Sequence, residues 1–89
     1  MKTAYLEVTY RRGKPFAAYY YLASNARLKR ARTERVEPGL IIDYSATGKP
    51  LGIEITAPAL VTLPALNRVL KGLGSPPIRR ADLAPLRAA

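Results

Sequence analysis

Two short apolar runs, residues 40–44 and 49–56, restrict the fold of this chain more than any other feature of its sequence. A Pro-Gly step precedes the first run, and the four residues between the runs end in Gly48, which suits a turn position with positive φ. Within each run, apolar and polar side chains alternate with the period of a strand. The pattern predicts a β-hairpin over residues 36–56.

The side chains of this hairpin also predict its register. A loop of four residues would set up three pairs: Tyr44 with Lys49, Ile42 with Leu51, and Leu40 with Ile53. Because paired residues share a face, one face would carry Leu40, Ile42, Tyr44, Leu51, Ile53 and Ile55. The other face would carry Ile41, Asp43, Gly52, Glu54 and Thr56. A slip of one residue would mix the two sets, so the side chains themselves support this register.

Two strands are expected near the start of the chain. Residues 3–10 alternate in polarity, a turn with Gly and Pro follows, and residues 16–23 contain three consecutive tyrosines. In that second strand Tyr19 and Tyr21 would face one way and Tyr20 the other. Both faces would then carry rings, which suits a central strand packed on each side or a face that lies against a partner.

Charged side chains dominate residues 27–36, and a helix is compatible with their propensities. The β-branched Thr33 and Val36 and the short links on either side favour a strand instead, over residues 28–36. Charge on both faces predicts a place at the edge of a sheet, where Lys and Arg discourage unwanted strand pairing.

A helix is expected after the hairpin, over residues 63–72. Thr62 is a good N-cap, proline is tolerated in the first turn, and leucines follow at helical spacing. A Ser-Pro-Pro break then leads into residues 75–89, for which the sequence favours a short helical turn or a tail that docks through Ile78, Leu83 and Leu86.

These elements predict one α+β domain over residues 1–74, with residues 75–89 as a C-terminal extension. The expected architecture is an antiparallel β-meander of about five strands with one C-terminal helix packed on one face. The strands are placed at residues 3–10, 16–23, 28–36, 40–44 and 49–56.

The chain has 89 residues and contains neither cysteine nor histidine. A domain this small buries a modest core, and below about 80 residues disulfides, metals or oligomerisation usually add stability. Disulfides, thiolate sites and imidazole ligands are excluded here. We therefore expect support from another chain, either a second copy in a homodimer or a small protein partner.

No apolar run approaches the roughly 18 residues that a membrane span requires, and Glu7 interrupts any signal-like stretch at the start. We expect a soluble, cytoplasmic protein that has no membrane contact, and the lack of cysteine fits that compartment.

The sequence shows no catalytic apparatus, because the usual nucleophile and base pairs need His or Cys. Asp43 and Glu54 share a predicted face and form the one carboxylate pair that an enzyme could use, provided that a cleft held them together. Solvated strand residues are the simpler interpretation. We expect no enzyme activity, no catalytic residue, no cofactor and no metal.

Two groups of residues are candidates for binding. The first is an interface formed by Tyr19, Tyr20, Tyr21, Leu66 and Leu70, with core packing as the alternative for both the tyrosines and the leucines. The second follows from the formal net charge of +9, which favours phosphate or an acidic surface. It consists of Arg27, Lys29, Arg30, Arg32 and Arg35. A solvated sheet edge is the alternative for this second group.

The chain also resembles a known family, through the segment Ala31-Arg32-Thr33-Glu34-Arg35-Val36-Glu37-Pro38-Gly39-Leu40-Ile41-Ile42-Asp43-Tyr44 and the later Leu51-Gly52-Ile53-Glu54-Ile55. With the tyrosine-rich strand, these residues resemble a bacterial domain-of-unknown-function family, number 2283, over about residues 16–57. The resemblance implies a small α+β protein without an established activity or agreed catalytic residues. Because some members are encoded beside small toxin-like proteins, it also implies an antitoxin-like binding role. The hairpin loop, commonly acidic in that family, is Ser45-Ala46-Thr47 here.

The leading hypothesis from the sequence is a non-enzymatic protein-interaction module, oligomeric and antitoxin-like. The alternative is a nucleic-acid-binding protein that uses the basic segment 27–35.

Overall fold

The computed structural model describes residues 4–22 and 29–86. The strands are β1 (Tyr5–Arg11), β2 (Lys14–Tyr21), β3 (Arg30–Glu37), β4 (Leu40–Ser45) and β5 (Pro50–Ile55). The helices are the 3-10 turn η1 (Pro58–Leu60), α1 (Leu63–Gly72), α2 (Arg80–Leu83) and the 3-10 turn η2 (Ala84–Leu86). Five antiparallel strands and a helix over residues 63–72 are confirmed, and a short second helix is added to them.

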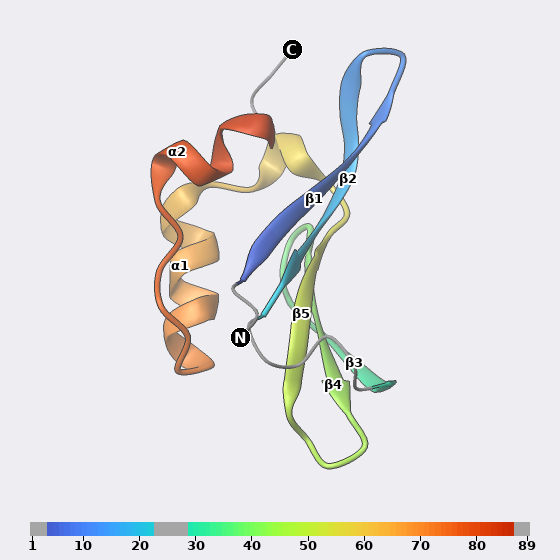
Figure 1. Ribbon diagram of the computed structural model, residues 1–89, viewed down its shortest axis with the longest axis vertical. Helices are drawn as coiled ribbons and strands as arrows, with labels where there is room; N and C mark the ends of the chain where they lie inside the picture. The colour runs from blue at the N-terminus through green and yellow to red at the C-terminus, as the bar shows by residue number, and fades with distance from the viewer. Residues whose placement is uncertain (1–3, 23–28, 87–89) are drawn as a thin grey trace.

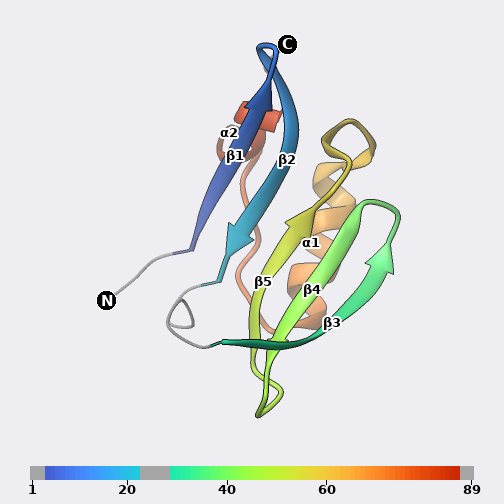
Figure 2. The same ribbon diagram turned by 90° about the vertical axis from the view of Figure 1, so that its right-hand side faces the viewer.

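The five strands form one sheet in the order β1-β2-β5-β4-β3 (Figure 2). The expected meander is therefore wrong, because β5 returns to pair with β2 and places β4 and β3 beyond it. The edge position expected for the segment over residues 28–36 is confirmed for the part in β3, whereas residue 28 lies outside the described residues. Burial explains both the strand order and the edge position of β3. All but the last residue of β3 are exposed, whereas β4 and β5 are largely buried. The apolar strands occupy the interior of the sheet, and the charged strand is left at its edge.

The hairpin of β4 and β5 has a different register from the one expected. Ile42 pairs with Ile53 and Leu40 with Ile55, two residues further along β5 than predicted. Tyr44 pairs with Pro50 instead of the predicted Lys49, which accounts for one residue of the shift. An irregularity in the pairing between Asp43 and Tyr44 accounts for the other. Because two residues are one full strand period, the separation of apolar and polar faces survives this shift.

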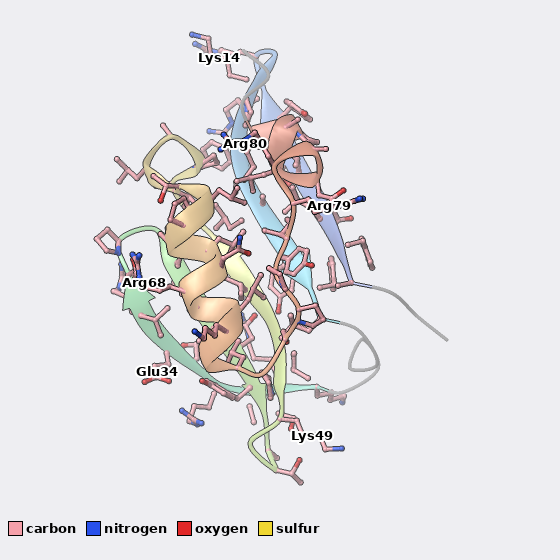
Figure 3. The ribbon with its side chains drawn as sticks, turned by 90° about the vertical axis from the view of Figure 1, so that its left-hand side faces the viewer. Lys14, Glu34, Lys49, Arg68, Arg79 and Arg80 are labelled. Atoms are coloured by element: carbon pink, nitrogen blue, oxygen red, sulfur yellow. The ribbon has the colours of Figure 1, made fainter. Side chains whose placement is uncertain are left out.

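One face of the sheet carries the core, and α1 and α2 both cover it (Figures 1 and 3). Ile53, Ile55, Leu66 and Leu70 are fully buried there. Leu66 and Leu70, which were candidates for an interface, are thus core residues, because the apolar stripe of α1 lies directly on the sheet. Tyr20 belongs to the same core, with 8% of its surface exposed.

The segment after α1 is both a short helix and a docked tail. Its apolar side chains Ile78, Leu83 and Leu86 are buried in the main core, as the sequence suggested. The Asn67 amide of α1 holds the segment in place, since Nδ2 donates to the Ile78 carbonyl at 3.1 Å and Oδ1 accepts from the Ile78 amide at 2.8 Å. Residues 75–86 therefore complete the same core as the sheet.

The opposite face of the sheet has no described helix over it (Figure 2). The described part of the chain thus has two layers, helices and sheet, with one sheet face left open. Among the described residues, no helix has the length and apolar character needed to cross a membrane.

Candidate functional site

The open face of the sheet presents side chains from all five strands, which the strand pairings align in two rows. One row consists of Arg35, Ile41, Glu54, Tyr19 and Glu7. The neighbouring row consists of Thr33, Asp43, Gly52, Tyr21 and Tyr5. We call these ten residues the open-face rows. They combine three tyrosine rings with three carboxylates, and Arg35 lies at one end.

Three tyrosine rings form a continuous line across β1 and β2. The rings of Tyr5 and Tyr21 are stacked, with centroids 4.6 Å apart and planes 17° from parallel. Tyr19 lies 4.6 Å from Tyr21 with its ring tilted by 49°. The Tyr21 hydroxyl donates to Glu7 Oε1 at 3.0 Å, and this bond is the main reason why the pKa of Tyr21 is raised. The rings are therefore held in a fixed arrangement.

Gly52 allows the third ring to lie flat against the sheet. A Cβ atom at this position would be 2.2 Å from Tyr19 Cε1, closer than any real contact. Because glycine leaves this space open, the Tyr19 ring crosses β5 and its hydroxyl donates to Asp43 Oδ2 on β4 at 2.7 Å. One side chain thus links three neighbouring strands.

Asp43 is almost completely buried beneath this ring, with 3% of its surface exposed. Its Oδ1 has no hydrogen-bond partner among the described residues, and the Arg30 guanidinium lies 3.9 Å from Oδ2. Burial raises the pKa of Tyr19, and the hydrogen bond to Asp43 raises it further. Tyr19 is therefore a neutral donor at every physiological pH, and Asp43 is the acceptor that fixes its position.

These contacts change the interpretation of the carboxylate pair. Asp43 is opposite Gly52 and bonds to Tyr19, whereas Glu54 is opposite Ile41. Asp43 is not a solvated strand residue, as the simpler interpretation had it, because the Tyr19 ring covers it. In the part of the chain that the structure describes, no three acidic side chains gather in a way that could hold a metal ion.

The tyrosine strand divides its side chains between the two faces as predicted. Tyr19 and Tyr21 lie on the open face, and Tyr20 lies in the core. Tyr5 was not among the candidate residues from the sequence, although its alternation with Leu6 placed it on the polar face of β1. The glycine in β5 was the available signal for the ring, because a glycine inside a strand often marks a close approach.

The basic segment does not form one surface. Arg27 lies outside the described residues, and the other four cations are exposed. The Arg32 guanidinium lies 4.2 Å above the Tyr44 ring, on the face that the helices cover. Arg30 approaches Asp43, and Arg35 ends a row of the open face. A shallow hollow of about 440 Å³ beside this strand includes Glu54 in its lining, which makes it a poor phosphate site.

Comparison with known proteins adds one finding. Residues 17–57 match a family described as protein of unknown function, DUF2283. No curated protein and no solved structure matched the chain.

The matched region runs from β2 to the end of β5 and leaves out β1, α1 and α2. It contains Tyr19, Gly52 and Asp43, the three residues that build the centre of the open face. The resemblance seen in the sequence is thereby confirmed. The match of residues 17–57 supports membership in DUF2283, a family of proteins of unknown function.

Proposed function

We propose that this protein is a non-enzymatic interaction module that binds a second copy of itself through the open face of its sheet. The observation that carries the proposal is the line of rings formed by Tyr5, Tyr21 and Tyr19, on a face that no described helix covers. Tyrosine suits such a contact, because its ring provides apolar area at a low cost in conformational entropy and its hydroxyl tolerates water.

The open face is long enough for a contact between two copies, because the longest axis of the molecule, 38 Å, runs along the sheet (Figure 1).

The charges of the open face complement a second copy. Glu7 on β1 and Arg35 on β3 lie at opposite ends of the same row. A twofold axis parallel to β5 would place β1 of one copy over β3 of the other, and each Glu7 would meet the Arg35 of its partner. The same axis would bring Tyr19 of one copy over Ile41 of the other.

Glu54 is the one residue of the row that opposes this arrangement. It lies on the central strand, so the two copies of Glu54 would come close to each other near the axis. Repulsion between them would limit the affinity, which makes the proposed dimer one that depends on concentration and salt.

Light scattering over a concentration series tests the proposal. The wild-type chain should change from monomer to dimer as its concentration rises. Ile41→Glu, at a partly buried position of the open face, should keep the protein monomeric. Leu60→Glu is the matched control, because Leu60 in η1 is 65% exposed and lies off the open face.

A wild-type chain that stays monomeric at every concentration would overturn the proposal. So would equal dimer formation by the Ile41→Glu and wild-type chains. In either case a different small protein, as in an antitoxin-like role, would become the remaining candidate partner for this face.

A further inference from the structure

The tip of the hairpin formed by β1 and β2 is a second exposed surface, distinct from the open-face rows. Figures 1 and 2 show that it projects beyond the rest of the sheet. Arg12 and Gly13 have φ angles of 55° and 78°, which is the pattern of a tight two-residue turn. The turn presents Arg11, Arg12 and Lys14 on a short, well-defined loop, and all three are exposed.

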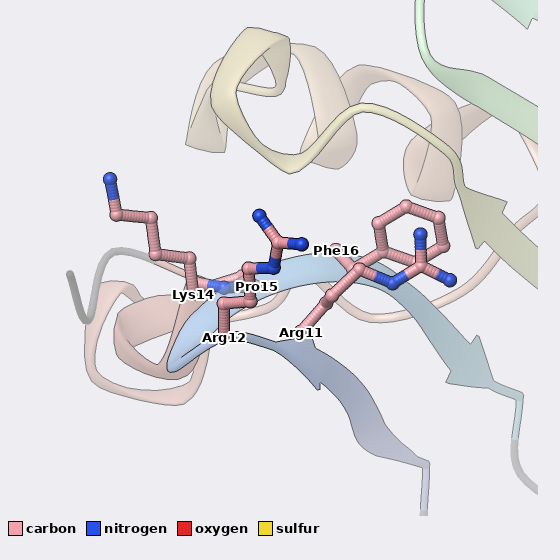
Figure 4. Close-up of a pocket in the computed structure, with 5 residues that line it drawn as sticks. All are labelled: Arg11, Arg12, Lys14, Pro15 and Phe16. Atoms are coloured by element: carbon pink, nitrogen blue, oxygen red, sulfur yellow. The ribbon is translucent and has the colours of Figure 1, made fainter.

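An exposed aromatic ring accompanies these cations. Phe16 is 49% exposed, and the Arg11 guanidinium lies 4.2 Å above its ring (Figure 4). A hollow of about 550 Å³ opens beside this pair. Its lining consists of Arg11, Arg12, Lys14, Pro15 and Phe16. No carboxylate lines it, unlike the hollow beside β3.

The charges of the tip are not neutralised by the described residues. The ion pairs of the described part of the chain involve Arg30, Arg68 and Arg79, and none involves a cation of the tip. The base of the tip is held in place, because the Tyr10 hydroxyl donates to the Pro85 carbonyl at 3.2 Å. Concentrated positive charge on an anchored loop is typical of a site for a polyanion.

We propose that this hairpin tip binds single-stranded nucleic acid. Arg12 and Lys14 contact successive phosphates, and the pair of Arg11 and Phe16 forms a platform on which one base stacks. The exposed ring selects the occupant, because a base in a duplex is already stacked and cannot lie on Phe16. The phosphate groups of a lipid surface or an acidic protein would use the cations but not the ring.

Fluorescence anisotropy of a labelled single-stranded oligonucleotide tests the charge contribution, with the full chain at several salt concentrations. The double variant Arg12→Gln/Lys14→Gln should lower the affinity roughly tenfold at low salt. It should also reduce the slope of log affinity against log salt by about 1.4, because each phosphate contact to a single strand contributes about 0.7.

The matched control is Lys49→Gln/Lys71→Gln, which removes the same charge elsewhere. Figure 3 shows Lys49 at the opposite end of the molecule from Lys14, and Lys71 lies in the last turn of α1. This control should retain most of the affinity. Equal losses in the two double variants would show diffuse attraction to the whole chain and would overturn the proposal.

Phe16→Ala tests the platform separately. It should lower the affinity roughly tenfold and leave the salt slope unchanged, whereas Phe16→Tyr should bind as the wild type does. A duplex of the same length should compete at least tenfold less well than the single strand. Equal competition by duplex, by polyglutamate or by vesicles of anionic lipid would overturn the proposal, and so would absence of binding at low salt.

Discussion

The bond between Tyr19 and Asp43 exists because residue 52 has no side chain. The Tyr19 ring occupies the space where a Cβ would stand and passes over β5 to reach its acceptor. In most strands a glycine weakens the element, by roughly 0.5–1 kcal/mol relative to alanine. Here the glycine makes room for an interaction between strands that are not adjacent, and that interaction buries a carboxylate.

Gly52→Ala should therefore destabilise the protein by roughly 1–3 kcal/mol, because the ring must move and Asp43 loses its donor. Urea unfolding measures the change. In a Tyr19→Ala background the same substitution should cost less than about 0.5 kcal/mol, since no ring then meets the new methyl group. Equal costs in both backgrounds would show that the ring is not the cause.

Tyr19→Phe should lower the free energy of unfolding at neutral pH by about 1–3 kcal/mol, because it leaves Asp43 buried without its donor. Tyr21→Phe is the control, since the Tyr21 hydroxyl bonds to an exposed Glu7 and its removal should cost less.

For the same variant we expect a stability difference that depends on pH. The pKa of Tyr19 is raised in the folded chain. The stabilisation that the Tyr19 hydroxyl provides is therefore complete below the tyrosine pKa of the unfolded chain, about 10, and is lost as the pH rises above that value. The stability difference between wild type and Tyr19→Phe should shrink from pH 8 to pH 11 in urea unfolding. A difference that stays constant would contradict the pKa shift.

At the scale of elements, the segment after α1 depends on one side chain. Two hydrogen bonds from Asn67 fix the backbone of Ile78, and three apolar residues then enter the core. The sequence favoured a helical turn or a docked tail, and the segment is both, because α2 is too short to be stable without its core contacts.

Asn67→Ala should loosen this segment without unfolding the sheet. Amide hydrogen exchange in residues 78–86 should accelerate, while exchange in β4 and β5 should change little. Arg68→Ala is the neighbouring control, because its ion pair with Glu37 is largely exposed and contributes little. Uniform acceleration across the chain would mean that the segment and the sheet unfold as one unit.

At the scale of the whole molecule, the proposed dimer makes a prediction about paired charges. Glu7→Arg and Arg35→Glu should each weaken the dimer about two- to fivefold, because each places like charges together. The double variant should recover most of the affinity, with the largest effects at low salt. Sedimentation equilibrium measures the dimer affinity of the wild type, the two single variants and the double variant. If the losses of affinity in the two single variants simply add in the double variant, the proposed axis is excluded.

Glu54→Gln provides an independent check of the same axis. It removes the repulsion between the two central carboxylates, so the dimer should become tighter, by roughly twofold or more at low salt. Glu34→Gln is the control, because Glu34 accepts from the Tyr44 hydroxyl on the other face of the sheet. A tighter dimer in both variants would indicate a general effect of net charge instead.

Local spacing along the chain is enough to locate the strands and to divide the side chains of each strand between its two faces. Alternation with period two separated Tyr20 from Tyr19 and Tyr21 within one strand, and Ile42 and Ile53 from Asp43 within the hairpin. The N-cap and the leucine spacing located α1, and the charge of residues 28–36 located the sheet edge. These features depend on neighbouring residues, whose spacing the sequence shows directly.

The way in which those segments combine depends on contacts between distant parts of the chain. The position of β5 between β2 and β4, the irregularity beside Asp43 and the reach of Tyr19 across Gly52 all join residues that are distant in the chain. Such choices depend on packing and hydrogen-bond satisfaction over the whole sheet, and several arrangements satisfy the same local pattern. The open face is a product of that assembly, because α1 and α2 both settle on the more apolar side.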